Sequence, residues 1–249
     1  MGQRSAKGFA EAEEVIARQE GGGDVQGQGS GAPVPQSDRQ HGGGEEEEVK
    51  YYCISLRETP ERTARVKQEF EREGVPVTWV WGIYGKSMQI KSEIPMHSDY
   101  FVTRGATALV LSHHMAWNLA EHDQADEFMV FEDDVVLPEN FLEKWAAIRA
   151  KVDDDVDGVY LQSCCVDDQK WKRKHRDELW DVRYPLCTAA IWWRQRAIPT
   201  LIEHTKPANT PVDILLEQKV LPKLKVLTVL PELVSQLTLQ GKMSSEVQA

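Results

Sequence analysis

Three carboxylates stand in a row in the segment FMVFEDDVVLPENF, which covers residues 128–141. Glu132, Asp133 and Asp134 follow an apolar run that is typical of a buried strand, and their mutual repulsion must destabilise the fold. In an open α/β sheet, ligands bind at this end of a strand. A divalent cation such as Mn²⁺ or Mg²⁺ would relieve the repulsion, because it prefers oxygen ligands and usually takes one or two carboxylates from the protein. The segment therefore predicts a metal site.

Residue spacing divides these carboxylates between two faces of the strand. If the extended conformation persists, Glu132 and Asp134 point to one side and Asp133 points to the other. A structural role remains open, since acidic residues ahead of a helix also stabilise its positive N-terminal end. The acidic run at residues 153–155 has no apolar strand before it and is predicted to be a solvated loop.

A second group of charged residues lies in SLRETPERTAR, where Arg57, Arg62 and Arg65 surround a predicted strand-to-helix turn. Guanidinium groups together with the free N–H groups of a helix start can bind a pyrophosphate or a nucleotide. Arginines are also common in the first turns of surface helices, so this signal alone is weak.

Strands and helices alternate along the chain from residue 49 onward. This order predicts an α/β domain whose mostly parallel central sheet is flanked by helices. Apolar and β-branched patterns place strands at 49–56, 75–83, 127–134, 157–163, 186–193 and 225–231, and 3.6-residue periodicity places helices at 59–74, 105–123, 138–152, 194–205 and 211–223. For the first helix we expect Thr59 as the N-cap, Pro60 in the first turn and Gly74 at the end, and Pro199 is expected to kink the fourth.

Residues 1–48 differ sharply from the rest, because they hold eleven of the chain's 17 glycines and almost no aromatic or branched apolar side chains. Such a segment cannot bury enough surface to offset its ordering entropy, so we predict a disordered tail before a single domain at 49–249. The net charge of −11 disfavours nucleic acid as a partner. No secretory signal or transmembrane segment is recognisable, and a cytoplasmic location is expected.

The four cysteines lack the CxxC spacing of a zinc site, and the adjacent pair Cys164 and Cys165 is unlikely to bond internally. We therefore predict reduced, mostly buried thiols. Trp192 and Trp193 are neighbours on one predicted strand, and because neighbours on a strand face opposite ways, we expect only one of them in the core.

Five sequence blocks occur in a recognisable order: an opening strand with Leu56 and Arg62, then RGATALVLSHHMAW, VFEDDVVL, TAAIWW and TPVDILL. Over roughly residues 50–245 this pattern resembles glycosyltransferase family 25, which includes lipooligosaccharide and procollagen galactosyltransferases. The resemblance implies a GT-A fold and transfer of a hexose, typically galactose, from a UDP-linked donor to a hydroxyl of a glycan, glycolipid or protein. A role in lipopolysaccharide biosynthesis is expected from the same resemblance.

The resemblance also implies roles for individual residues. Asp134 is expected to contact a Mn²⁺ (or Mg²⁺) ion that bridges the donor diphosphate, and Glu132 is expected to help through the ribose or the water on the metal. Asp213, in TPVDILL, is the expected general base of an inverting reaction, although it is equally typical of an ordinary first-turn helix residue. The remaining residues expected at the nucleotide-sugar site are Leu56, Arg57, Arg62, Arg65, Ser112, His113 and Asp133.

Some positions depart from the family pattern or extend it. Ser55 stands where an asparagine is usual, and Ala108 with Leu109 replaces a Gly-Cys pair. Gln236 and Ser245 follow the family's C-terminal pattern and are expected to close the pocket. Acceptor contacts are expected from variable loops at 84–101 and 167–180; the second is basic and either meets an anionic glycan or is simply solvated.

Two other functions remain possible from the sequence. A sugar nucleotidyltransferase would need a glycine-rich phosphate loop after the first strand, and SLRETPER contains no glycine. A non-catalytic domain that binds a nucleotide sugar or a partner protein would have no physical reason to keep repelling carboxylates together.

Overall fold

The structure, a computed structural model, describes residues 49–88, 103–164, 172–182 and 185–243. Cys165 and Ser245 lie outside these ranges, as do parts of both predicted acceptor loops. The N-terminal tail also lies outside them, so its disorder and the domain boundary at residue 49 stay predictions. Within the described ranges, no helix has both the length and the apolar character needed to cross a membrane.

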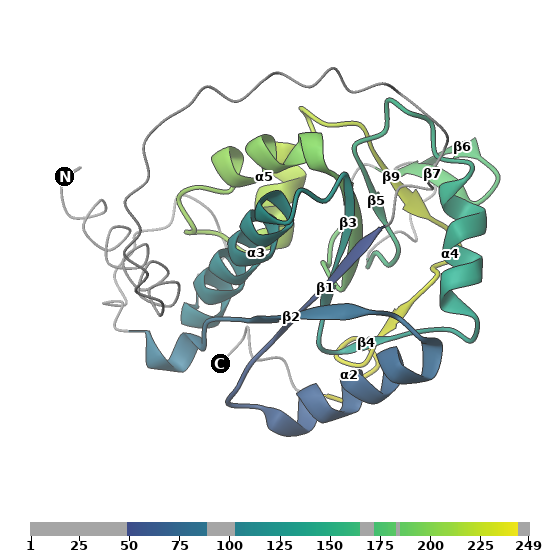
Figure 1. The fold of residues 1–249 in the computed structure, drawn as a ribbon. Coiled ribbons are helices and arrows are strands. Elements are labelled where there is room, and N and C mark those ends of the chain that lie inside the picture. Colours follow the sequence, from purple (N-terminus) through teal and green to yellow (C-terminus); the bar gives the residue numbers. More distant parts are fainter. Residues whose placement is uncertain (1–48, 89–102, 165–171, 183–184, 244–249) are drawn as a thin grey trace, which may run out of the picture. The chain divides into compact units, whose positions relative to one another are not determined.

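The centre of the fold is a mixed eight-stranded sheet with the order β2-β1-β3-β8-β5-β9-β7-β6 (Figure 1). Its strands are β1 (Lys50–Ser55), β2 (Val77–Trp81), β3 (Glu127–Glu132), β5 (Gly158–Tyr160), β6 (Lys172–Arg176), β7 (Leu179–Val182), β8 (Ala190–Arg194) and β9 (Val226–Val229). The predicted α/β class is confirmed.

The prediction of a mostly parallel sheet needs correction. β1 pairs in parallel with β2 and β3, and β5 pairs in parallel with β9. β8 runs antiparallel to both β3 and β5, and β7 runs antiparallel to β6 and β9. The β6–β7 hairpin occupies residues predicted to be a loop, because KRKHR carries no apolar signal. A polar strand is tolerated there since β6 lies at the edge of the sheet.

A short two-stranded ladder joins β4 (Val135–Val136), immediately after the carboxylate row, to β10 (Ser235–Gln236) near the other end of the described chain. The backbone N–H of Leu237 also donates to the carbonyl of Asp134 at 3.0 Å. The segment around β10 is thereby fixed beside the end of β3.

Helices cover both faces of the sheet (Figure 1). Side chains of α2 (Pro60–Glu73) and α4 (Phe141–Arg149) pack on one face, while α3 (Arg104–His122) and α5 (Ile198–His204) pack together on the other. A four-residue helix, α6 (Val212–Leu215), continues into the π-helical turn η4 (Leu216–Val220), and η1 (Gly85–Ser87) and η3 (Gln195–Ala197) are single 3₁₀ turns.

The first helix has the ends that its sequence predicts. Thr59 precedes Pro60 in the first turn of α2, although its side chain makes no capping hydrogen bond, and Gly74 ends the helix with a φ of 66°. Pro199 lies in the first turn of α5. It therefore starts that helix and does not kink it, because a proline in the first turn removes no intrahelical hydrogen bond.

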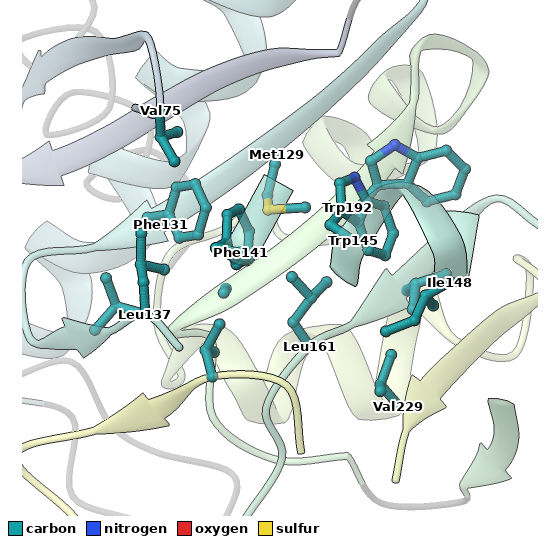
Figure 2. Close-up of a cluster of buried hydrophobic side chains, with 14 of the residues drawn as sticks. Val75, Met129, Phe131, Leu137, Phe141, Trp145, Ile148, Leu161, Trp192 and Val229 are labelled. Carbon is teal, nitrogen blue, oxygen red and sulfur yellow. The ribbon is translucent and has the colours of Figure 1, made fainter. Parts of the chain in front are cut away.

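The core contains aromatic side chains on both faces of the sheet. On the α2/α4 face, Trp192 packs against Trp145 with ring centroids 5.8 Å apart, near Phe131 and Phe141 (Figure 2). Trp193 packs edge-to-face on Tyr160 on the opposite face. Both Trp192 and Trp193 are at most 1% exposed, so the expectation that only one is in the core was wrong. Because helices cover both faces, adjacent strand residues are buried together.

The expectation of reduced thiols was wrong for two of the cysteines. Cys164 and Cys187 form a disulfide, with Cα atoms 5.9 Å apart, and Cys53 is a buried free thiol. The chain folds so that Cys164, just after β5, lies opposite Leu186, just before β8. This proximity is set by the sheet and is invisible in the spacing along the sequence.

Candidate active site

A cavity of about 290 Å³ opens at the carboxyl ends of β1 and β3. This size is close to the lower end of the range for small-molecule sites. Its lining comes from the end of β1, the turn η1, the start of α3, the end of β3, the segment before β8, the start of α6 and the residues around β10: Ile54, Ser55, Leu56, Arg62, Ile83, Tyr84, Gly85, Lys86, Gly105, Ala106, Ala108, Leu109, Ser112, Glu132, Asp133, Asp134, Cys187, Thr188, Pro211, Val212, Asp213, Gln236, Thr238 and Leu239.

Asp133 points to the α2 side of the sheet. Its carboxylate accepts a hydrogen bond from Ser55 Oγ at 2.9 Å and forms an ion pair with Arg62, and its backbone carbonyl accepts from Arg65 at 2.7 Å. Burial and the charge of Glu132 still hold the pKa of Asp133 above its ordinary value, against the opposing effect of Arg62. The carboxylate therefore fastens the start of α2 to the end of β3.

Glu132 points to the other side, toward α3. His113 Nε2 lies 3.3 Å from its Oε1, and the Thr188 hydroxyl donates to the same oxygen. Burial raises the pKa of Glu132, but these two hydrogen bonds and the nearby charges outweigh burial and lower it overall. Glu132 and Asp133 therefore point to opposite sides of the sheet, although Asp133 already belongs to the turn that follows β3.

Asp134 is held by neutral donors. Its Oδ2 accepts from Gln236 Nε2 at 2.9 Å and from the Thr238 hydroxyl, while its Oδ1 is buried and has no hydrogen-bond partner among the described residues. Burial, followed by the charge of Glu132, raises the pKa of Asp134. The chain turns at Asp133 and Asp134, so the strand alternation ends at Glu132, yet Glu132 and Asp134 both line the cavity.

Asp213 lines the cavity from the first turn of α6. Its Oδ1 accepts from the backbone N–H of Ile214 at 2.9 Å, and the backbone of Cys187 lies close to the carboxylate and also acts to lower its pKa. Burial, together with the charge of Glu132, raises the pKa of Asp213. The two interpretations of this residue are compatible, because it is both a first-turn helix residue and a cavity residue.

The other predicted site residues separate into two groups. Leu56, Arg62 and Ser112 line the cavity, and Ser112 Oγ accepts from the Ile83 N–H at 2.9 Å. Arg57 and Arg65 are not part of the lining. The Arg57 guanidinium carbon lies 4.8 Å from the Trp81 ring centroid, and the Arg65 guanidinium donates to the backbone carbonyl of Asp133.

Two histidines of α3 have different surroundings. His113, 2% exposed, reaches the site through Glu132. His114 lies 2.6 Å from the Thr205 hydroxyl, which itself donates to the Leu201 carbonyl, so His114 Nε2 is the donor of the pair. Burial lowers the pKa of His114 to about 4, which keeps the ring neutral.

Sequence reasoning missed Thr188 and Thr238 as site residues. Thr188 begins the TAAIWW block, so the sequence pattern included this residue but gave it no role in the site. Thr238 carries no local signal, since its contact with Asp134 spans 104 residues. Gly85 was missed for a similar reason: a Cβ there would lie 2.6 Å from the backbone nitrogen of Gly105, so only glycine lets η1 pack on the first turn of α3.

Metal ligands are few in this cavity. Across the described ranges, no group of three or more His, Cys, Asp or Glu side chains is arranged to hold a metal ion. Any divalent cation here would need oxygens from a ligand or from water, which is the usual situation for Mg²⁺ and similar ions at phosphate-binding sites.

The sequence was compared with known protein families. Residues 48–216 match the model of glycosyltransferase family 25, described as an LPS biosynthesis protein. The chain belongs to this family. The family resemblance inferred from the five sequence blocks is thereby confirmed, and the enzyme class is confirmed at the level of the family.

One curated protein shares part of its sequence with this chain. The lipooligosaccharide biosynthesis protein lic2B of Haemophilus influenzae is 28% identical to the family 25 chain over 92 residues. That match covers 36% of this chain and 35% of lic2B, so the similarity spans about a third of the relative's length.

Similar solved structures have low sequence identity. A glycosyltransferase involved in glycosylation of the major capsid of PBCV-1 is 14% identical, with 72% of this chain and 80% of that chain covered and a TM-score of 0.44. An active-site mutant of LgtC is 10% identical, with 72% of each chain covered and a TM-score of 0.39. The family assignment rests on the sequence match and not on these structures.

Proposed function

We propose that this family 25 chain transfers a hexose, with galactose as the first candidate, from a UDP-linked donor to a hydroxyl of a glycan or glycolipid acceptor. The observation that carries this proposal is the arrangement of Glu132, Asp133, Asp134 and Asp213 around one cavity at the carboxyl end of the sheet. The family is described by LPS biosynthesis and lic2B by lipooligosaccharide biosynthesis, which supports a glycan or glycolipid acceptor over a protein.

Asp134 is the residue best suited to hold a divalent cation. Its buried Oδ1 has no partner among the described residues, while Gln236 and Thr238 fix the other oxygen and so orient the carboxylate. Glu132 Oε1 already accepts two hydrogen bonds, so Glu132 is placed to act through the ribose or a water molecule. When bound with the donor diphosphate, Mn²⁺ or Mg²⁺ would stabilise the negative charge of the leaving nucleoside diphosphate.

Asp213 is the proposed general base. Burial and the charge of Glu132 raise its pKa, which makes the ionised carboxylate a better proton acceptor at neutral pH. It takes the proton of the acceptor hydroxyl while that oxygen bonds to the anomeric carbon. The bond between the anomeric carbon and the diphosphate oxygen breaks, its electron pair leaves with the nucleoside diphosphate, and the configuration inverts.

Arg62 is the proposed contact for the donor diphosphate, because it lines the cavity and its position is fixed by Asp133. Leu56 and Ser112 line the same region and are proposed to pack against the donor. The contribution of Arg57 and Arg65 is proposed to be indirect, since each is held against a neighbouring side chain or backbone group outside the lining.

The test is the release of nucleoside diphosphate from a panel of nucleotide sugars, with Mn²⁺ and glycan acceptors, by the full chain. Asp134→Asn is expected to lower turnover by about 100-fold or more, because it removes a charge that acts on the developing transition state. Asp155→Asn, an exposed carboxylate paired with Lys225, is the matched control and is expected to leave turnover unchanged.

Several outcomes would change the proposal. Unaltered turnover in Asp134→Asn would remove the metal role, and unaltered turnover in Asp213→Asn would remove the base. A product with retained anomeric configuration, read from the coupling of its anomeric proton, would exclude inversion. If the only turnover were formation or consumption of pyrophosphate, the chain would be a nucleotidyltransferase. A non-catalytic domain would release nothing, and Mn²⁺ together with UDP would still raise its melting temperature.

A further inference from the structure

We propose that the Cys164–Cys187 disulfide is a positioning clamp for the catalytic carboxylates, and that its reduction converts the enzyme to a slow form; this rests on the proposed function. The bond joins the loop after β5 to the segment before β8, which forms one wall of the cavity. Backbone pairing accompanies it, with the Cys164 N–H donating to the Leu186 carbonyl at 3.1 Å.

The clamped segment contacts both sides of the site. The backbone of Cys187 lies close to the Asp213 carboxylate and lowers its pKa, and the next residue, Thr188, donates its hydroxyl to Glu132. One residue further on, the Ala189 carbonyl accepts from the backbone N–H of Glu132 at 2.9 Å. A shift of this segment would therefore move the neighbours of the proposed base Asp213 and of Glu132 together.

The backbone of Cys187 is held in an unusual conformation. Its φ is 72°, in the left-handed region that residues other than glycine seldom adopt. Such a conformation persists when the surrounding structure fixes it, and it is concentrated at functional sites. The disulfide is the covalent part of that restraint, so breaking it leaves Cys187 free to relax toward a common conformation.

Reduction is chemically accessible at this position. Cys164 and Cys187 are both partly exposed residues, and we expect a small dithiol to reach the bond between them. Two electrons and two protons pass to the bond, the Sγ–Sγ bond breaks into two thiols, and the sulfurs of the reagent close into a disulfide. The compartment then decides the state, because reducing compartments favour thiols and oxidising ones favour the bond.

The test uses the double variant Cys164→Ser with Cys165→Ser, which removes the bond and prevents Cys165 from replacing Cys164. Cys165→Ser alone is the matched control, since it keeps Cys164 and Cys187 paired. The double variant is expected to lose about 10–100-fold in kcat for nucleoside diphosphate release, as small misplacements of catalytic groups do. Its KM for the donor is expected to stay within about twofold. The carboxylate of Asp133, which orients Arg62, and the donors that orient Asp134 lie outside the segment before β8 that the disulfide holds.

A second readout does not depend on activity. Hydrogen exchange of the amides at residues 186–189 is expected to accelerate in the double variant and in the dithiol-treated protein, but not in Cys165→Ser. Thiol titration in denaturant is expected to find two thiols before reduction and four after it. Circular dichroism and the melting temperature show whether the double variant is folded; for a variant that fails to fold, the dithiol-treated wild type gives the answer.

The outcomes separate this proposal from the proposed function. Four thiols before reduction, unchanged exchange, or an unchanged kcat in a folded double variant would overturn the clamp while leaving glycosyl transfer intact. No nucleoside diphosphate release from any form would overturn the proposed function, and the exchange and thiol data would still decide whether the bond restrains the segment.

Discussion

Strand β3 has a carboxylate at its first residue and a row of carboxylates at its end. The carboxylates at the two ends have different kinds of hydrogen-bonding and ionic partners. At the start, buried Glu127 is paired with Arg149 and with Arg194 at 3.0 Å, and accepts from Trp192 Nε1 at 3.2 Å. At the end, Asp134 Oδ2 accepts hydrogen bonds from neutral donors only, and Asp134 Oδ1 has no hydrogen-bond partner among the described residues.

This difference distinguishes a structural carboxylate from one available to a ligand. Charged donors at Glu127 compensate for its removal from water, so nothing further is needed at that end. At Asp134 two neutral hydrogen bonds and the charge of Arg62 offset only part of the cost of burial, so the pKa is raised. Proteins retain such destabilising groups where function uses them. The comparison supports the ligand site at the end of β3 independently of any motif.

The largest expected effect is at the compensated end. Glu127→Ala would remove the buried carboxylate that pairs with Arg149 and Arg194 and accepts from the Trp192 indole N–H, and we expect a loss of about 3 kcal/mol in the free energy of unfolding. The value lies at the low end of the usual range because the Arg149 and Arg194 side chains are 29% and 19% exposed. Urea denaturation measures it. Asp155→Asn, an exposed ion-pair variant, should leave the midpoint unchanged; equal effects in the two variants would remove the contrast.

A second effect concerns the positive charge that His114 would carry if it were protonated in the folded protein. Burial, and then the charges of Lys206 and His113, lower the pKa of His114 to about 4, so between its ordinary pKa and that value only the unfolded chain takes up the proton. Stability is therefore lost as the pH falls through this window, by about 2 kcal/mol at pH 5. His114→Gln should remove that loss.

The measurement is the free energy of unfolding of both proteins at pH 7.5 and pH 5. The matched control is His122→Gln, whose side chain is 84% exposed and should leave the pH dependence as it is. If the wild type and His114→Gln lose equal stability on acidification, His114 is not the group responsible.

The smallest expected effect is a gain in the free energy of unfolding when Asp134, at the end of β3, loses its charge. Because the pKa of Asp134 is raised in the folded state, its ionised form opposes folding. The stability it removes returns as the pH falls from this raised pKa to the ordinary one, where the folded protein binds the proton before the unfolded chain does. Asp134→Asn should therefore stabilise the metal-free protein at pH 7.5 by about 0.5–2 kcal/mol while abolishing turnover. The gain should shrink at pH 4. Destabilisation at pH 7.5 would mean that Asp134 is a structural carboxylate after all.

The sequence predicted those features that depend on neighbouring residues. Pro60 and Gly74 mark the ends of α2 because their backbone preferences act locally, and the apolar run before Glu132 identified β3. Features set by tertiary pairing were missed. The Cys164–Cys187 bond depends on where β5 and β8 meet, and β6 has no apolar residue to indicate a strand.

The site shows the same division. The carboxylate row and Asp213 are recognisable because their types and positions match chemistry and a family pattern. Thr188 and Thr238, which hold Glu132 and Asp134, are ordinary residues whose importance comes from the folded chain. The choice between Arg62 and its neighbours Arg57 and Arg65 likewise required the structure, because three arginines around one turn look alike in sequence.

The contact between Gly85 and Gly105 has a consequence for how acceptor preference can change. Gly85 lies near the start of the predicted acceptor loop at 84–101 and Gly105 follows its end, and their backbones touch where η1 meets α3. The two ends of the segment that joins them therefore lie at one place in the fold. Because the free-energy cost of closing a surface loop rises only slowly with its length, we expect the length and sequence of this segment to tolerate change without alteration of the carboxylate end of β3.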